Sequence, residues 1–528
     1  MEILPDELCQ EIFARLAGFD QRLGLVRPSL PRLDTRFGNF GLVHPNLSTL
    51  NEAIRAPFRI AATCSRWRAL VLSSPELWAF AHAQDDQPAD DVHLRMCIER
   101  SGQHPLDVWI HSGAEYWQRF PENSDEENFD EEKDEENKTN TPVMFFEWLD
   151  LLQMNAHRWR RIRIDFPRPT PIDKFNIFTK PMPYLEELVL STPSTAFDET
   201  MVNTEWDSDL NSQQLYFQNC SNLRSLASHA TIMIPSVALS KLEYLSFSLR
   251  GLDDDTPLWA ALAMTPALKE LNIYYGYRGQ YSSEPPPTPR HLPALRKLGL
   301  LGYFHFDQDW SQYLSVPNVN TLSVSIEPTN NLEITFATFS TTVRHLVITT
   351  VENGHSGGIF TRSDAEALAS LEHVETLELR DIPSQMIRGV SEEFFACLAG
   401  VDDHLGNPLP KWGQTLRKII LTDCTLDIAS CGSLAKLVAM RTTAASANAS
   451  DAFELQLVNT KFVHFINDSS IPDSLGPVKH LFESSIVELD NYASRRYYSE
   501  DLEDSDEAMS EQDDQRSEFN NEITMDDA

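Results

Sequence analysis

A six-residue pattern, apolar-x-x-apolar-x-apolar, returns along most of this chain and limits its possible folds more than any other feature. Nine complete copies begin at Trp159, Leu185, Leu242, Leu268, Leu295, Val319, Val343, Val374 and Leu416. From 242 to 343, successive copies start 24 to 27 residues apart. A unit of this length cannot bury its apolar face alone, and stacking on its neighbours produces a continuous core. The sequence therefore predicts a stack of repeats.

The last two apolar positions of each copy predict a β-strand. They lie two residues apart, so both side chains point to one face of a strand, while the first position turns inward from the preceding loop. Four prolines each stand two residues before a copy, where they favour an extended backbone: Pro183, Pro266, Pro293 and Pro317. Helices are expected near Ser363, where Glu366 completes a capping box, and from Ser433 to Met440. Strands that alternate with helices predict an α/β fold with parallel strands.

The repeat array is irregular. Leu223 with Leu226 forms a partial copy, and Leu455 with Leu457 forms a possible last one. The spacing widens to 42 residues between the copies that begin at 374 and 416. In its central part the period resembles that of leucine-rich repeats. The alternative is an ordinary α/β sheet with similar local sequence, although no nucleotide-binding loop accompanies the strands.

Residues 1–80 predict three short helices. Pro5 suits a first helical turn, and the acidic Asp6 and Glu7 follow where the helix dipole favours anions. One apolar stripe at helical spacing consists of Leu8, Ile12, Phe13 and Leu16, and a second pattern that starts near Pro57 includes Ala61, Ala62, Cys64, Trp67 and Leu70. A short third turn from Ser74 presents Leu77 and Trp78. Three short helices cannot bury so many large apolar groups, so part of this surface is expected to contact a partner.

These residues resemble an F-box, the three-helix module that docks on the small adaptor subunit of cullin-RING ubiquitin ligases. The matching stretches are Leu4-Pro5-Asp6-Glu7-Leu8, Ile12-Phe13, Cys64-Ser65-Arg66-Trp67-Arg68-Ala69-Leu70 and Leu77-Trp78. The resemblance implies that the adaptor-docking face is formed or supported by Leu4, Pro5, Leu8, Ile12, Phe13, Cys64, Trp67 and Leu70.

The first helix and the second are unusually far apart for an F-box. Residues 17–56, which contain Pro28, Pro31 and Pro45, stand where the family has a short turn. A surface insertion adds little closure entropy, so docking can survive it. Two shorter segments, Ser101 to Leu106 and His157 to Arg160, are similar to segments of an expanded group of fungal F-box proteins.

The acidic charge is concentrated in two segments. The formal net charge is −36; residues 122–136 hold ten acids and one base, and residues 500–528 hold thirteen acids and one base. Like-charged blocks repel themselves and bury nothing, so both are expected to be disordered. A protein that binds nucleic-acid phosphates would normally carry the opposite charge. We therefore expect no nucleic-acid partner.

The cysteines indicate a reducing compartment. There are seven, and no pair has the C-x-x-C spacing of a zinc knuckle. The first residues are acidic and lack the pattern of a signal peptide, and no stretch approaches the roughly 20 apolar residues of a membrane span. A cytoplasmic or nuclear protein without metal, cofactor or membrane contact is expected.

One short motif keeps an enzymatic alternative open. Residues Gly354-His355-Ser356-Gly357-Gly358 match the G-x-S-x-G nucleophile elbow of serine hydrolases. That elbow needs a strand that leads directly into the turn and a helix that begins at the serine. Here Val351-Glu352-Asn353 intervene, and the next helix signal is Ser363. A glycine-rich surface loop is the simpler interpretation.

Two further clusters have structural explanations. Pro285-Pro286-Pro287-Thr288-Pro289 could bind an SH3-type domain, but a rigid loop between repeats is the simpler interpretation. The basic side chains around Trp159 are Arg158, Arg160, Arg161 and Arg163. They cannot all share one face of a strand, so a solvated edge is expected, with an acidic partner or the acidic loop as the alternative.

Together these observations predict an α/β protein with a small N-terminal all-α F-box and an irregular leucine-rich-repeat-like solenoid. The expected parts are an F-box domain at 1–80 with the insertion at 17–56, a connecting helix and strand at 90–121, a disordered acidic loop at 122–140, the solenoid at 143–490 and a disordered acidic tail at 491–528. The expected function is non-enzymatic: substrate receptor of an SCF-type ubiquitin ligase, with the adaptor, the cullin and an unidentified target protein as partners. A repeat scaffold outside ligases is the second hypothesis, and a hydrolase that uses Ser356 is the third.

Overall fold

The structure is a computed structural model that describes part of the chain. The described residues are 5–16, 47–84, 90–111, 150–165, 180–191, 219–228, 239–248, 256–275, 289–302, 312–326, 336, 339–350, 367–368, 370–380, 392–399, 415–427, 433–439, 441, 453–465 and 486–489. The expected disordered segments at 122–140 and 491–528, and the loop that contains Ser356, lie outside them.

The chain divides into two compact units. The first comprises Met1–Gly358, Glu366–Asp381 and Gly413–Leu416, and the second Ile359–Ala365, Ile382–Trp412 and Arg417–Ala528. Both units contain parallel strands and helices, so the α/β fold class is confirmed. None of the described helices is long and apolar enough to cross a membrane.

The first unit begins with helices. They are α1 (Asp6–Leu16), α2 (Leu47–Thr63), α3 (Ser65–Leu72) and the 3-10 turn η2 (Pro75–Trp78). Three further elements lie between strands: α4 (Asp90–Arg100), the 3-10 turn η4 (Ala156–Arg158) and α8 (Thr256–Ala263). Cys64 caps α3, because its Sγ accepts a hydrogen bond from Trp67 N at 3.4 Å. Trp78 ties η2 back to α3 by donating from Nε1 to the Val71 carbonyl at 2.8 Å.

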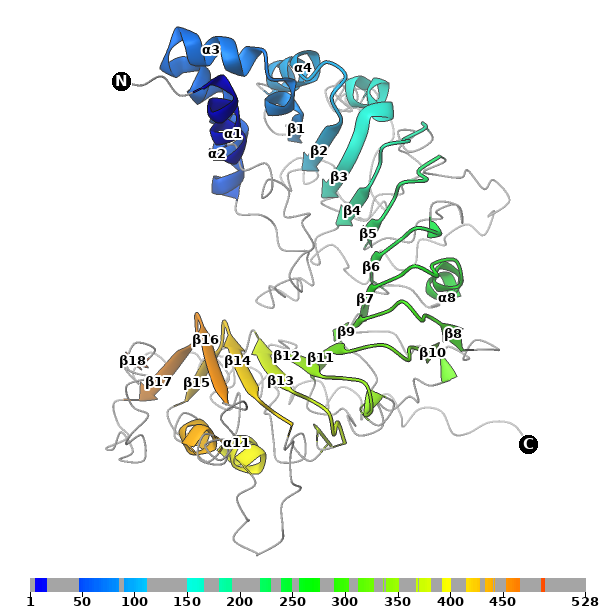
Figure 1. The fold of residues 1–528 in the computed structure, drawn as a ribbon, viewed down its shortest axis with the longest axis vertical. Coiled ribbons are helices and arrows are strands. Elements are labelled where there is room, and N and C mark those ends of the chain that lie inside the picture. Colours follow the sequence, from blue (N-terminus) through cyan, green and yellow to red (C-terminus); the bar gives the residue numbers. More distant parts are fainter. Residues whose placement is uncertain are drawn as a thin grey trace, which may run out of the picture. The chain divides into compact units, whose positions relative to one another are not determined.

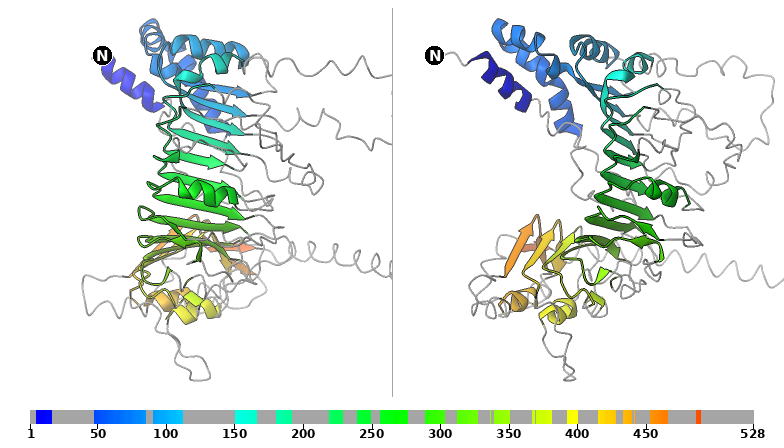
Figure 2. Two further views of the ribbon diagram at one scale, coloured as in Figure 1. Left: turned by 90° about the vertical axis from the view of Figure 1, so that its right-hand side faces the viewer. Right: turned by 45° about the vertical axis from the view of Figure 1, so that its right-hand side comes forward.

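A single parallel sheet follows in the first unit, and its strands stack in the order of the sequence (Figure 1). They are β1 (Phe80–Gln84), β2 (Leu106–His111), β3 (Trp159–Asp165), β4 (Glu187–Ser191), β5 (Ser225–Ser228), β6 (Tyr244–Ser248), β7 (Glu270–Tyr275), β9 (Lys297–Gly302), β11 (Thr321–Ile326), β12 (His345–Thr350) and β13 (Thr376–Arg380). Figure 2 shows these strands stacked with α1 to α4 at the β1 end.

The register of the sheet aligns the repeated apolar pattern. Leu271 pairs with Leu298, Leu298 with Leu322, and Leu322 with Leu346. All of these side chains are buried, and their neighbours two residues further along each strand are buried as well. The apolar side chains thus form continuous rows across the strands, as the pattern predicts. The partial copy at Leu226 is a strand of the same sheet, β5.

Asparagine side chains join successive copies just before the strands. Asn222 Nδ2 donates to the Pro183 carbonyl at 2.8 Å, and Asn318 Nδ2 donates to the Pro293 carbonyl at 2.9 Å. Each proline is one of those that precede a copy. The carbonyl of each proline thus accepts a hydrogen bond from a side chain that precedes the next copy. A small second ladder, β8 (Arg290–His291) with β10 (Leu314–Ser315), also joins two successive copies.

The second unit contains α11 (Glu392–Ala399), β14 (Lys418–Thr422), β15 (Thr425–Asp427), β16 (Glu454–Val458), β17 (Lys461–Phe465) and β18 (Ile486–Leu489). Strand β14 pairs with β16, while β15, β17 and β18 form a separate parallel sheet. The chain turns between the two at Asp423 and Asn459, both with positive φ (53° and 52°). Asn459 Nδ2 donates to Asp423 Oδ1 at 3.1 Å, which holds the two turns together. Residues 433–439 are helical, as predicted for 433–440.

Candidate protein-docking site

The helical module at the start of the first unit has a dense core. Phe13 of α1 and Trp67 of α3 make an edge-to-face contact with ring centroids 5.2 Å apart. Phe58 of α2 contacts Trp78 in the same way at 5.2 Å. The buried members of the cluster are Cys9, Phe13, Ile60, Leu70, Val71, Leu77, Trp78 and Cys97. Packing of this kind holds α1, α2 and α3 in fixed positions relative to one another.

The outer face of α1 carries apolar side chains that this core does not use. Leu8 is 51% exposed and Ile12 is 42% exposed, whereas Phe13 is 1% exposed. Leu8 and Ile12 are four residues apart, so they lie together on one side of the helix. Pro5, at the start of the same helix, is exposed too. Two large exposed apolar side chains on a rigid helix form a patch suited to contact with another protein.

Six of the eight residues singled out from the sequence separate into two groups. Pro5, Leu8 and Ile12 form the outer patch, which we call the α1 patch. Phe13 and Leu70 are buried in the core and support the helix from within, together with the half-buried Trp67. Cys64 is exposed and acts as the cap of α3. Leu4 lies outside the described residues.

An ion pair fixes the start of α1 against α3. The guanidinium of Arg66 contacts Asp6 Oδ1 through both Nη2 and Nε, the latter at 3.2 Å. This bond raises the pKa of Arg66, and because the pair is exposed its contribution to stability is small. Its effect is geometric, since it sets the first turn of α1, which carries Leu8.

The face of the sheet that alternates with the apolar rows carries charged and polar side chains, and many of them are buried. Near its β1 end, charged side chains pair across strands: Arg160 holds Asp107 in a bidentate contact at 3.0 and 2.7 Å. Arg163 Nε donates to Asp165 Oδ1 at 2.9 Å, and the same carboxylate accepts from Trp109 Nε1 at 2.6 Å. Each of these acids neutralises a neighbouring base, so this end of the face carries little net charge.

The arginine cluster differs from the expected solvated edge. Arg163 is 2% exposed and Arg158 is 3% exposed, so the expectation is wrong for both. Arg161 is half-buried and its Nε lies 3.8 Å from Glu187 Oε2. Burial is the main cause that raises the pKa of Glu187. Arg163 is paired with Asp165 of its own strand, and Arg158 donates to Ser101 and to main-chain carbonyls. Only Arg161 has carboxylates, Asp107 and Glu187, at the paired positions of β2 and β4.

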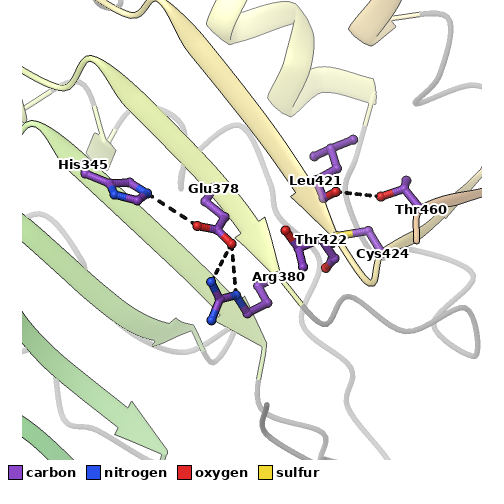
Figure 3. A network of polar contacts seen from close by, with 7 residues as sticks. All are labelled: His345, Glu378, Arg380, Leu421, Thr422, Cys424 and Thr460. Carbon is purple, nitrogen blue, oxygen red and sulfur yellow. Dashed lines mark hydrogen bonds and ion pairs between the residues drawn. The ribbon is translucent and has the colours of Figure 1, made fainter. Parts of the chain in front are cut away.

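Another charged group lies on the same face at β12 and β13 (Figure 3). Arg380 Nη2 contacts Glu378 Oε1 at 2.6 Å, and His345 Nε2 lies 3.5 Å from Glu378 Oε2. Burial alone would raise the pKa of Glu378, but the contacts with His345 and Arg380 outweigh it and lower the pKa to about 2. In the second unit, Thr460 Oγ1 donates to the Leu421 carbonyl at 2.8 Å, also drawn in Figure 3.

Several charged side chains described on the sheet face are engaged in ion pairs. Within the described ranges, no group of three or more His, Cys, Asp or Glu side chains could hold a metal ion. Asp107, Asp165 and Glu378 are each paired with an arginine, and Glu270 is paired with Lys297. The pairings of Arg158, Arg160 and Arg163 were not predicted from the sequence. Ser101 and the arginines 158 and 160 lie in the two short segments, Ser101 to Leu106 and His157 to Arg160, that resemble fungal F-box proteins.

Comparison with known proteins adds no functional assignment to this geometry. No model of a known protein family matches the chain. No curated protein matches it closely enough to count as a relative.

Proposed function

We propose that this protein is the substrate-recognition subunit of an SCF-type cullin-RING ubiquitin ligase. In this proposal the helical module α1 to η2 is an F-box, and the α1 patch docks on the ligase adaptor. The stacked strands form a leucine-rich-repeat-like solenoid that binds the target protein. The protein would act in the cytoplasm or the nucleus, without a cofactor.

One observation carries the proposal: Leu8 and Ile12 are exposed on a helix whose opposite side is locked into a core by Phe13. When a partner covers an apolar side chain that is exposed to water, the free energy of the system falls by about 25 cal/mol per Å² of apolar area buried. The surrounding sequence, Leu4-Pro5-Asp6-Glu7-Leu8 and Cys64 to Leu70, resembles the adaptor-docking module. The resemblance and the exposure indicate the same helix face.

The mechanism that follows is proximity. A target held on the sheet and a ubiquitin-charged enzyme held through the adaptor would share one complex, which raises the effective concentration of target lysines near the charged enzyme. The separate enzyme would carry out the chemistry. No residue of this chain needs to be catalytic.

Copurification of the adaptor from native cells tests the proposal. A Leu8→Ala, Ile12→Ala double variant should lose the adaptor, because truncated apolar anchors at an interface weaken binding by about 2 kcal/mol each. The matched control is Leu72→Ala on α3, because the Leu72 side chain is as exposed as that of Ile12 (42%). Retention of the adaptor by the double variant at the wild-type level would contradict the proposal.

The same experiment separates the ligase from a scaffold. The adaptor and the cullin should both copurify with the wild-type protein, and proteasome inhibition should enrich a target. Recovery of the adaptor without the cullin would indicate a scaffold role outside ligases. A fluorophosphonate label that reacts with wild-type protein and not with Ser356→Ala would indicate a hydrolase instead.

A further inference from the structure

The helical module continues into the sheet without a linker. Turn η2 ends at Trp78 and β1 begins at Phe80, so Ala79 alone lies between them. The Ala79 carbonyl already belongs to the sheet, since it accepts a hydrogen bond from Asp107 N at 2.8 Å. Domains that move independently are usually joined by exposed linkers. This boundary has no room for one.

Helix α4 packs on both parts. Its Cys97 belongs to the core of the helical module, and its Arg100 guanidinium lies 5.0 Å from the centre of the Trp78 ring. His93 packs on Phe58 of α2 with ring centroids 5.1 Å apart. The same helix packs against β1. Any rotation of the helical module against the sheet would therefore disturb α4.

One guanidinium holds the end of α4. Arg158 Nη2 donates to Ser101 Oγ at 2.6 Å and to the His104 carbonyl at 2.9 Å, and Nε donates to the same carbonyl at 3.2 Å. Nη1 donates to Asn155 Oδ1 at 3.1 Å and to the Ile98 carbonyl at 3.5 Å. Burial lowers the pKa of Arg158. A buried guanidinium with several directed donors resists movement, because each lost partner leaves a polar group unsatisfied in a low-dielectric site.

The hydrogen bonds of Arg158 join segments far apart in the sequence. Arg158 ends η4, and β3 begins at the next residue, Trp159. Arg160, two residues on, holds Asp107 of β2. The turn that follows α4, the start of β2 and the start of β3 thus meet at two arginines of one short segment.

We infer that Arg158 is a positioning residue that locks the helical module and the first strands of the sheet into one rigid body. It touches neither the adaptor nor the target in the proposed function. It fixes the direction in which the sheet extends from the α1 patch. The lock itself follows from the contacts above, and only its purpose, holding a bound target at a set place relative to the adaptor, rests on the proposed function.

Distances between two spin labels test the lock in the full-length protein. The labels are placed at Arg55 of α2 and at Lys241 before β6, both exposed. Cys64 is exposed and is changed to serine, which can still cap α3, and Cys431, outside the described residues, is changed as well. The other cysteines are buried. The variants are Arg158→Met, which removes the donors and keeps the stem, and Ser101→Ala, which removes the acceptor at 2.6 Å. The control is Arg224→Met, whose side chain is 68% exposed.

A lock predicts one narrow distance distribution in the wild type and in the control. Arg158→Met and Ser101→Ala should broaden it or add a second population, and amide exchange between 101 and 107 should accelerate by on the order of tenfold. Should Arg158→Met fail to fold, Ser101→Ala carries the test. A wild-type distribution that is already broad, or folded variants with the wild-type distribution, would overturn the inference.

Failure of the lock and failure of the ligase proposal give different results. Adaptor copurification depends on Leu8 and Ile12 and should persist in Ser101→Ala. Absence of the adaptor from wild-type preparations would remove the proposed purpose, while the spin-label distances would still report whether the lock exists.

Discussion

The side chain of Asn272 occupies the place where a Cβ on Gly299 would lie. The two residues are paired on the neighbouring strands β7 and β9, and a Cβ built on Gly299 would collide with Asn272 Oδ1 and lie 3.1 Å from its Cγ. Asn272 is buried there, and its Nδ2 donates to the Tyr244 hydroxyl at 3.4 Å. Gly299 is therefore required for steric reasons rather than for backbone freedom.

Replacement of this glycine should destabilise the protein. Gly299→Ala forces the buried Asn272 carboxamide to move, and overpacking of this kind costs about 1–3 kcal/mol. Chemical denaturation of the full-length protein measures the loss. In an Asn272→Ala background the same glycine change should be nearly neutral, because the colliding atoms are gone. An equal loss in both backgrounds would show that the collision is not the cause.

Replacement of Gly102 should also lower the stability of the protein, but for a different reason. Gly102 follows α4 with a φ of 56°, and a Cβ there would meet no atom within 4 Å. Gly102→Ala should cost about 1 kcal/mol through left-handed backbone strain alone. Gly102→Asn should cost less, because asparagine tolerates this conformation. Thermal unfolding of both variants checks the order, and an alanine variant as stable as the asparagine variant would contradict it.

Low pH should lower the stability of the protein, partly because the Glu378 carboxylate becomes protonated. Its pKa is about 2 in the folded protein against an ordinary 4.5, because Arg380 and His345 favour the carboxylate. The stability from this depressed pKa is fully present above pH 4.5 and is lost as the pH falls towards about 2. It amounts to on the order of 1–2 kcal/mol after solvent screening. The stability difference between wild type and Glu378→Gln should therefore shrink across this range.

A neighbouring acid supplies the control for that pH effect. Glu375 also contacts an arginine, Arg344, at 2.6 Å, but both side chains are well exposed. Glu375→Gln should change stability little at any pH, since exposed ion pairs contribute roughly 0–1 kcal/mol. If the difference between wild type and Glu378→Gln were constant from pH 6 to about 2, contrary to the linkage expected for a depressed pKa, Glu378 would not be the titrating group.

The two sides of α1 should differ sharply in stability experiments. Phe13→Ala removes a fully buried ring and should cost about 3–5 kcal/mol. Leu8→Ala removes a half-exposed side chain and should change stability by less than about 0.5 kcal/mol. Thermal unfolding without the adaptor provides the comparison. A large loss in Leu8→Ala would show that Leu8 belongs to the core and is not available to a partner.

The stability of the protein should fall more when one partner of the buried pair Arg163 and Asp165 is removed than when both are replaced. Asp165→Ala leaves the Arg163 guanidinium buried without its carboxylate and should cost about 3–5 kcal/mol. The double variant Arg163→Met, Asp165→Leu should recover part of that loss, because a well-packed apolar pair needs no charge partner. Urea unfolding of the wild type and the two variants measures the effect, and a double variant less stable than Asp165→Ala would contradict it.

The positions of the strands could be predicted because they depend on local geometry. Side chains alternate across a strand with a period of two, so Leu298 and Leu300 had to face one side wherever the strand lay. A helix brings residues four apart together, so Leu8 and Ile12 had to share a face. Stacking of incomplete units then made a parallel sheet the expected result, and the register between Leu271 and Leu298 agrees with it.

Only the tertiary structure decided which distant residues the polar side chains meet. Nothing near Arg158 in the sequence indicates Ser101, which is 57 residues away, and Asn272 and Gly299 meet only because β7 and β9 are neighbours. A buried charge takes whichever partner the register places beside it, and the register results from the packing of the whole unit. Periodicity therefore determined the strands and the face of α1 that remains open, whereas the long-range fold determined that Arg158 and Arg163 became buried structural links rather than a solvated edge.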